Sequence, residues 1–223
     1  MKIMLSPSIM CADLLNMGEQ IRLLEEAKVD LIHFDIMDTT FTTTTMLPPM
    51  MIPAIKKITD IPVDIHVMID KPERILDTLL PLSKGNYVSI HVETTKEAES
   101  IIQQIRSAGG KPAVALNSAT PVSTLEELIP HVDMVNLILG NAGIGPRQPL
   151  DDQLLKKVEK VRKMFDDAGC RDAIVEVDGG VSFETAHRTW QKGANAFVLG
   201  TSSIYMQGKS VVEQCANLRK YLQ

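Results

Sequence analysis

The sequence predicts an α/β protein in which eight strands alternate with helices and close into a single (β/α)₈ barrel. Short runs of β-branched and apolar residues alternate with stretches of helical periodicity, at the spacing of roughly 20 to 30 residues that a βα unit has. A chain of 223 residues holds eight such units and leaves none for a second domain, so residues 1–223 are expected to form one domain. The expected strands are residues 3–9, 31–37, 63–68, 87–92, 112–116, 134–139, 173–177 and 196–199.

The stretches between the strands carry apolar residues at helical spacing, which gives each helix one apolar stripe to pack on the sheet. Such stripes begin at Leu14, Ile75, Ile101, Leu154 and Val211. A doubly wound open sheet is the alternative architecture. The first strand lacks the Gly-x-Gly-x-x-Gly turn that marks a dinucleotide-binding sheet, and the count of eight units favours the barrel.

Helix starts are also marked in the sequence. A Ser or Thr followed three residues later by Glu is a capping-box pattern, in which two side chains satisfy the first free N–H groups of a helix. Three helices are expected to begin in this way, at Thr94 with Glu97, Ser123 with Glu126 and Ser210 with Glu213.

Composition and charge exclude several classes of function. The chain is 44% hydrophobic and 23% charged, and its net charge of −5 is not that of a nucleic-acid-binding protein. Its three cysteines are far apart and form no Cys-x-x-Cys motif, which is typical of a reducing compartment. The longest uncharged stretch, residues 39–55, carries six threonines and three prolines and is no membrane span. We therefore expect a cytoplasmic protein without nucleic-acid or membrane partners.

Metal-ligand side chains gather at the carboxyl ends of the expected strands, where barrels carry their chemistry. His33 and Asp35 share one face of the second strand, His66 lies near the end of the third, and Asp178 follows the seventh. Each alone is more often a structural residue, but two imidazoles and two carboxylates at one barrel mouth predict a divalent-metal site. Asp35 and Asp178 could flank a ligand, one on each face, to remove a proton from a carbon and return one to the opposite side.

Glycine-containing loops follow the seventh and eighth strands, the common location of phosphate sites in barrels. Gly179 and Gly180 precede Ser182, an expected helix N-cap, and Gly200 and Thr201 follow the eighth strand. Backbone N–H groups and the positive end of a short helix can hold an anion there. The same glycines would also suit tight turns without any ligand.

Five motifs taken together resemble the ribulose-phosphate 3-epimerase family, and they extend over residues 6–202: Ser6-Pro7-Ser8-Ile9, His33-Phe34-Asp35-Ile36-Met37-Asp38, Asp64-Ile65-His66-Val67-Met68, Ala115-Leu116-Asn117-Ser118-Ala119-Thr120-Pro121 and Glu176-Val177-Asp178-Gly179-Gly180. The resemblance implies a (β/α)₈ barrel with one divalent metal ion, most commonly zinc, with iron, manganese or cobalt as other options. The implied metal ligands are His33, Asp35, His66 and Asp178, and the two aspartates are also the implied catalytic acid/base pair. The implied substrate contacts are Ser8, His66, Met37 and Met68, and the implied phosphate contacts, in loops after the sixth, seventh and eighth strands, are Gly143, Gly145, Gly179, Gly180, Gly200 and Thr201.

The implied reaction is inversion of C3 in a ketose phosphate through an enediolate, with D-ribulose 5-phosphate and D-xylulose 5-phosphate as the default pair. Two loops depart from the family pattern. A threonine-rich segment, residues 39–45, follows the second strand, and after the sixth strand Ile138 stands where the family has a methionine. The same loop has Pro146 in place of a glycine, and Arg147 could reach the phosphate or be a surface charge. Allulose 6-phosphate and a tetrulose phosphate therefore remain alternative substrates.

Two other classes of function are alternatives to an epimerase. Phosphate-binding decarboxylases and hexulose-phosphate synthases need an Asp-x-Lys-x-x-Asp motif on the third strand, where this chain has His66 in place of lysine. A phosphosugar-binding protein without catalysis is the second, and retention of both histidines and both aspartates argues against it. Members of the family are often dimers or hexamers, which implies a homo-oligomer by analogy only.

Overall fold

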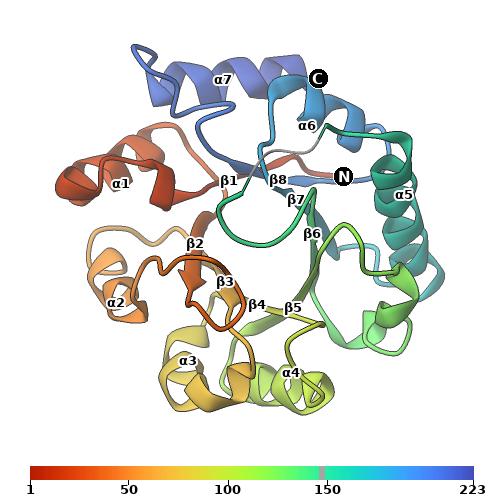
Figure 1. Ribbon diagram of the computed structural model, residues 1–223. Helices are drawn as coiled ribbons and strands as arrows, with labels where there is room; N and C mark the ends of the chain where they lie inside the picture. Colours follow the sequence, from red (N-terminus) through yellow and green to blue (C-terminus); the bar gives the residue numbers. More distant parts are fainter. Residues whose placement is uncertain (146–148) are drawn as a thin grey trace.

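Eight parallel strands form the centre of the molecule. The computed structural model describes residues 1–145 and 149–223, and within them the strands are hydrogen-bonded in the order β1-β8-β7-β6-β5-β4-β3-β2. A parallel bridge between Ser8 and His33 joins the end of β1 to β2 and completes the ring, so the expected barrel is confirmed (Figure 1). The strands are β1 (Met4–Pro7), β2 (Ile32–Met37), β3 (Val63–Met68), β4 (Tyr87–His91), β5 (Lys111–Leu116), β6 (Met134–Ile138), β7 (Ile174–Asp178) and β8 (Ala196–Leu199).

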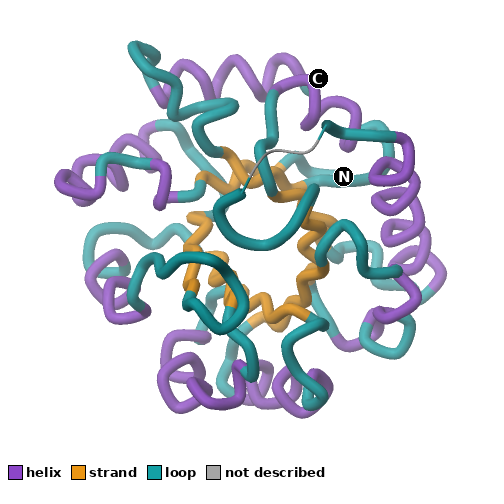
Figure 2. The backbone as a smooth tube through the Cα atoms, in the orientation of Figure 1, coloured by secondary structure: helices purple, strands orange, loops and turns teal. Residues whose placement is uncertain are grey.

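Helices surround this ring and pack on its outer face (Figure 2). The α-helices are α1 (Met17–Glu26), α2 (Ile52–Ile55), α3 (Leu76–Ser83), α4 (Ala98–Ser107), α5 (Asp152–Asp167), α6 (Phe183–Trp190) and α7 (Val211–Tyr221). Short 3₁₀ turns are η1 (Ile9–Cys11), η2 (Leu14–Asn16), η3 (Pro49–Met51), η4 (Pro72–Ile75), η5 (Val122–Leu125) and η6 (Ile129–His131). Among the described residues, no helix is long and apolar enough to cross a membrane.

Two of the expected helix caps are present. The Ser210 side chain accepts the backbone N–H of Glu213 at the start of α7, with 3.4 Å between oxygen and nitrogen. Ser182 caps α6 in the same way, through the N–H of Thr185 at 3.1 Å. The loop that holds Gly179 and Gly180 therefore leads directly into a capped helix N-terminus.

Two other expected caps are wrong. The chain makes a turn after β4 and enters α4 only at Ala98, with Glu97 as N-cap, so Thr94 lies outside the helix and donates to the carbonyl of His91. Ser123 lies inside η5, because the segment between β5 and β6 forms two 3₁₀ turns in place of an α-helix. Pro130 lies in the second of these turns, and its missing N–H prevents a continuous helix through the segment.

Alternation along the strands separates an apolar outer face from a polar interior. On β3, the side chains of Val63, Ile65 and Val67 belong to the core between sheet and helices, while Asp64 and His66 alternate with them and lie inside the barrel. At the amino ends of the strands a small apolar cluster fills the interior: Leu31, Tyr87, Ala113, Met134, Ile174 and Ala196. The polar side chains are therefore collected towards the carboxyl ends of the strands.

Candidate active site

Four side chains from three strands meet inside the mouth of the barrel. One ligand-type atom from each of His33, Asp35, His66 and Asp178 lies within 4.8 Å of the other three. Asp35 and His66 are neighbours in the β2–β3 register, and Asp178 ends β7 on another side of the ring. The structure thus brings together the four residues that the sequence proposes as metal ligands.

The distances within this cluster leave one nitrogen without a hydrogen-bond partner. His33 Nε2 lies 3.1 Å from Asp35 Oδ1 and 3.6 Å from Asp178 Oδ2. His66 Nδ1 lies 3.4 Å from a carboxylate oxygen of each aspartate, but neither contact has hydrogen-bond geometry, so among the described residues this buried nitrogen is unpartnered. Two imidazole nitrogens and two carboxylate oxygens that converge in this way are a suitable donor set for a divalent transition metal.

Neighbouring side chains orient two of the four residues. His33 Nδ1 lies 2.5 Å from Asp64 Oδ2, on the side of the ring away from the cluster, and both side chains are fully buried. A carboxylate behind an imidazole fixes which ring nitrogen carries the proton and leaves the other nitrogen for a metal ion. Ser8 Oγ donates to Asp35 Oδ2 at 2.5 Å, so one oxygen of Asp35 is held by the serine while the other faces the histidines.

Two residues that sequence reasoning did not assign to the site lie behind His66. His66 Nε2 is 2.9 Å from His91 Nε2, and His91 Nδ1 is 3.1 Å from Glu93 Oε2. Burial lowers the pKa of His91 to about 4, whereas hydrogen bonds from His91 and Thr120 outweigh burial and lower the pKa of Glu93 to about 2. The available signal was a His-x-Glu pattern at the end of β4, which puts both side chains on the inner face next to β3.

Charge compensation within the cluster perturbs the titration of all four residues. Burial alone would raise the pKa values of Asp35 and Asp178, but the adjacent His33 and His66 lower both. Burial alone would lower the pKa values of His33 and His66, but the aspartates raise both above their ordinary value. In the metal-free chain the imidazoles therefore tend to hold the positive charge that two adjacent carboxylates require.

These shifts predict a pH window for the stability of the metal-free chain. The depressed carboxylate pKa values stabilise the fold above the unfolded value of about 3.9, and this contribution is lost as pH falls through the folded values. The raised histidine pKa values stabilise it below the unfolded value of about 6.5, and this contribution is lost as pH rises through the folded values. Melting temperature measured against pH should therefore fall on both sides of this window. A melting temperature that rises steadily above neutral pH would contradict the assignment.

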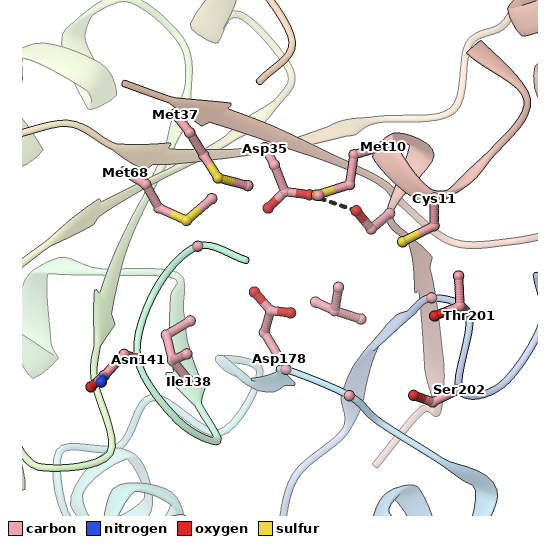
Figure 3. Close-up of a pocket in the computed structure, with 16 residues that line it drawn as sticks. Met10, Cys11, Asp35, Met37, Met68, Ile138, Asn141, Asp178, Thr201 and Ser202 are labelled. Carbon is pink, nitrogen blue, oxygen red and sulfur yellow. Dashed lines mark hydrogen bonds between the residues drawn. The ribbon is translucent and has the colours of Figure 1, made fainter. Parts of the chain in front are cut away.

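A cavity opens directly above the cluster (Figure 3). Asp35 and Asp178 point towards each other across it, with Met37 and Met68 on one side and Thr201 on the other. The other predicted site residues in its wall are Ser8, Gly143, Gly179, Gly180 and Gly200, and the wall also contains Met10, Cys11, Ile138, Asn141 and Ser202, which were not predicted.

Not every predicted residue reaches this cavity. His33 and His66 lie beneath it and are fully buried. Gly145 lines an adjoining cavity bounded by Phe41 and Thr42 of the threonine-rich loop. Pro146 and Arg147 lie outside the described residues, so the role of Arg147 stays a prediction. The loop after β6 crosses the barrel mouth (Figure 1), where it meets the threonine-rich loop.

Comparison with known proteins adds a family and a fold. The sequence model described as "Ribulose-phosphate 3 epimerase family" matches residues 4–205. Ribulose-phosphate 3-epimerase of Bacillus subtilis is 36% identical over 205 residues, which covers 92% of this chain and 93% of that protein. Chloroplastic ribulose-5-phosphate-3-epimerase of Arabidopsis thaliana is 36% identical over 202 residues, which covers 90% of this chain and 71% of that protein.

Solved structures show the same fold at much lower sequence identity. A mutant tryptophan synthase α-subunit from Pyrococcus furiosus superposes with a TM-score of 0.69 at 14% identity, covering 99% of this chain and 96% of that one. At this identity the likeness concerns the barrel and not the chemistry.

Proposed function

We propose that this chain, which belongs to the ribulose-phosphate 3-epimerase family, inverts C3 of a ketose phosphate. Its proposed substrate and product are D-ribulose 5-phosphate and D-xylulose 5-phosphate. The single observation that carries the proposal is the pair of carboxylates, Asp35 and Asp178, that face each other across the cavity above the histidines (Figure 3). A carbon held between them would present one face to each carboxylate, as an inversion by two groups requires.

His33, Asp35, His66 and Asp178 are the proposed ligands of one divalent metal ion. The unpartnered Nδ1 of His66 and the convergence of four donor atoms support this assignment. Zinc suits such nitrogen and oxygen donors, and iron, manganese and cobalt bind similar sets. When bound, the cation supplies Lewis-acid stabilisation of negative charge on the ketose oxygens.

The two aspartates divide the proton transfers between them. One carboxylate accepts the proton from C3 as the C–H bond breaks, which leaves an enediolate, and the other, which starts protonated, donates its proton to the opposite face. Ser8 holds Asp35 in position through Oδ2, so the carboxylate cannot rotate away from the substrate. After each turnover the protonation states of the two aspartates are exchanged, and the reverse reaction restores them.

The side chains around the carboxylates suit a charged intermediate that must be kept from water. Met37 and Met68 are 5% and 2% exposed and lie together at one side of the cavity (Figure 3). Their thioethers offer a polarisable, uncharged surface, and we assign them to the substrate together with Ser8 and His66. Ile138 lines the same wall where the family has a further methionine.

The phosphate group is assigned to the glycine-containing loops after β6, β7 and β8, which contribute to the wall of the cavity. Gly179 and Gly180 both have positive φ angles, +105° and +66°, and the loop leads into the capped N-terminus of α6. Backbone N–H groups at a helix start are a suitable site for an anion. Gly200, Thr201 and Gly143 line the same cavity, while Gly145 borders the adjoining cavity.

Gly179→Ala should weaken substrate binding more than it slows the chemical step. A φ of +105° is strained for alanine by about 1–3 kcal/mol, so the loop is expected to relax away from its phosphate-binding conformation. KM for the ketose phosphate should rise by about tenfold, which corresponds to about 1.4 kcal/mol of binding free energy. Gly208→Ala is the matched control, since Gly208 has a φ of +72° in an exposed turn with open space around it. Equal KM changes in the two variants would contradict the phosphate assignment.

The adjoining cavity favours a second candidate, a longer ketose phosphate such as allulose 6-phosphate. It shares Ile138, Gly143 and Gly179 with the first cavity and extends to Phe41 in the threonine-rich loop. The test is a comparison of kcat/KM for four-, five- and six-carbon ketose phosphates with the zinc-loaded protein. A highest value for ribulose 5-phosphate supports the proposed substrate, and a highest value for another ketose replaces it. Binding of all of them without epimerisation of any would leave a phosphosugar-binding protein.

A further inference from the structure

His66 has an unusual environment, because the group behind it is a second histidine and not a carboxylate. The Nε2 atoms of His66 and His91 are 2.9 Å apart, and both rings are fully buried. Only one proton fits between two nitrogens at this distance, so one ring donates and the other accepts. Which ring donates decides where His66 carries its other proton or lone pair.

Glu93 determines this choice from the far side of His91. Its Oε2 lies 3.1 Å from His91 Nδ1, and an ionised carboxylate can only accept a hydrogen bond. His91 therefore carries its proton on Nδ1 and presents the lone pair of Nε2 to His66. His66 must then donate from Nε2, so the nitrogen left for a cation is its Nδ1, which lies 3.4 Å from an oxygen of each of Asp35 and Asp178.

Glu93 is itself held in one orientation. Its Oε1 accepts the backbone N–H of Asn117 at 2.7 Å and the hydroxyl of Thr120 at 2.5 Å, both from the loop after β5. With Oε1 occupied by two donors, Oε2 remains for His91. Phe41 also packs against the His91 ring, with 4.9 Å between ring centroids, and this contact limits the ring's rotation.

The geometry points to His91 and Glu93 as positioning residues that fix the tautomer of His66, so that His66 binds the divalent cation through Nδ1 while His33 binds it through Nε2. This inference rests on the proposed metal site. His33 contacts the carboxylate of Asp64 directly, whereas the imidazole of His91 lies between His66 and the carboxylate of Glu93. Loss of such outer contacts typically weakens metal binding by about 10- to 100-fold.

Glu93→Gln should exchange the donor and acceptor roles of His91 and His66 while it preserves the size of the side chain at position 93. The amide oxygen of glutamine would remain with Asn117 and Thr120, because both donate, and the NH₂ group would face His91 Nδ1. His91 would then carry its proton on Nε2, and His66 would be left with its proton on Nδ1, where the cation should bind. Glu126→Gln is the matched control, since Glu126 is exposed at the end of η5, outside the site.

The test uses long-range ¹H–¹⁵N correlation spectra of the His91 ring in the metal-free full chain at neutral pH, with His131 and His187 outside the barrel as references. We expect His91 to carry its proton on Nδ1 in the unaltered chain and on Nε2 in Glu93→Gln. Zinc affinity, measured by competition with a chelator, should fall about 10- to 100-fold in Glu93→Gln and stay unchanged in Glu126→Gln.

An Nε2–H tautomer of His91 in the unaltered chain would overturn the inference, as would unchanged zinc affinity in a folded Glu93→Gln protein. The spectrum of the unaltered chain tests the proposed tautomer of His91 even if the Glu93→Gln variant does not fold. Failure of the unaltered chain to bind zinc or to epimerise a ketose phosphate would count against the proposed function, and the tautomers are read without metal or substrate.

Discussion

Replacement of Asp178 by asparagine should reduce epimerisation by about 10²- to 10⁴-fold, the usual contribution of a positioned acid or base. The amide keeps the shape of the side chain but can neither accept the C3 proton nor return one. Asp35→Asn should have an effect of the same order, because each direction of the reaction needs both carboxylates. Initial rates in the two directions, with zinc at saturation, measure the loss.

Asp172→Asn serves as the control for this pair, since Asp172 is exposed at the opposite end of the barrel, just before β7. It should leave the rate and the melting temperature unchanged. Full activity in either Asp35→Asn or Asp178→Asn, with zinc content verified, would contradict the assignment of two carboxylates to the proton transfers.

Removal of the metal ion should have the second large effect. Lewis-acid stabilisation is worth several kcal/mol at the transition state, so a chelator-treated protein should lose at least about a hundredfold in rate and recover it with added zinc. A ligand that binds only the folded chain also stabilises it, by about 2.7 kcal/mol at a hundred times its dissociation constant. Melting temperature with and without zinc should therefore differ clearly.

His33→Gln separates this effect from non-specific binding of metal ions. The variant lacks one of the four proposed ligands and should show little thermal stabilisation by zinc. His131→Gln, an exposed histidine outside the site, should behave like the unaltered chain. Full activity after exhaustive chelation, or equal zinc stabilisation of both variants, would rule out the proposed metal site.

Much of the fold can be predicted from the sequence because the strands have a simple physical signature. Parallel strands that face helices on one side and a polar interior on the other read as short apolar runs with embedded polar residues, as in Val63–Met68. Each strand in the structure lies within two residues of its expected bounds. The helix predicted to begin at Ser123, after β5, is wrong. The capping pattern there indicates a helix start, but Pro130 interrupts the helix that would follow.

From the sequence, only those site residues could be predicted that lie at the carboxyl ends of strands. His33, Asp35, His66 and Asp178 could be grouped because strands of a barrel present their last inward residues at one mouth. The contact between His66 and His91 could not be predicted, because it depends on how two rings on neighbouring strands are rotated. The orientation of Glu93 depends likewise on a backbone N–H from a loop whose path the sequence does not specify.

The most direct test of the account is the fate of the C3 hydrogen. The zinc-loaded protein is mixed with unlabelled ribulose 5-phosphate in D₂O, and substrate and product are analysed by NMR at early conversion. Abstraction by one aspartate and delivery by the other predict xylulose 5-phosphate with deuterium at C3, while the recovered ribulose 5-phosphate remains largely unlabelled. Product that retains hydrogen at C3 would contradict the two-carboxylate mechanism.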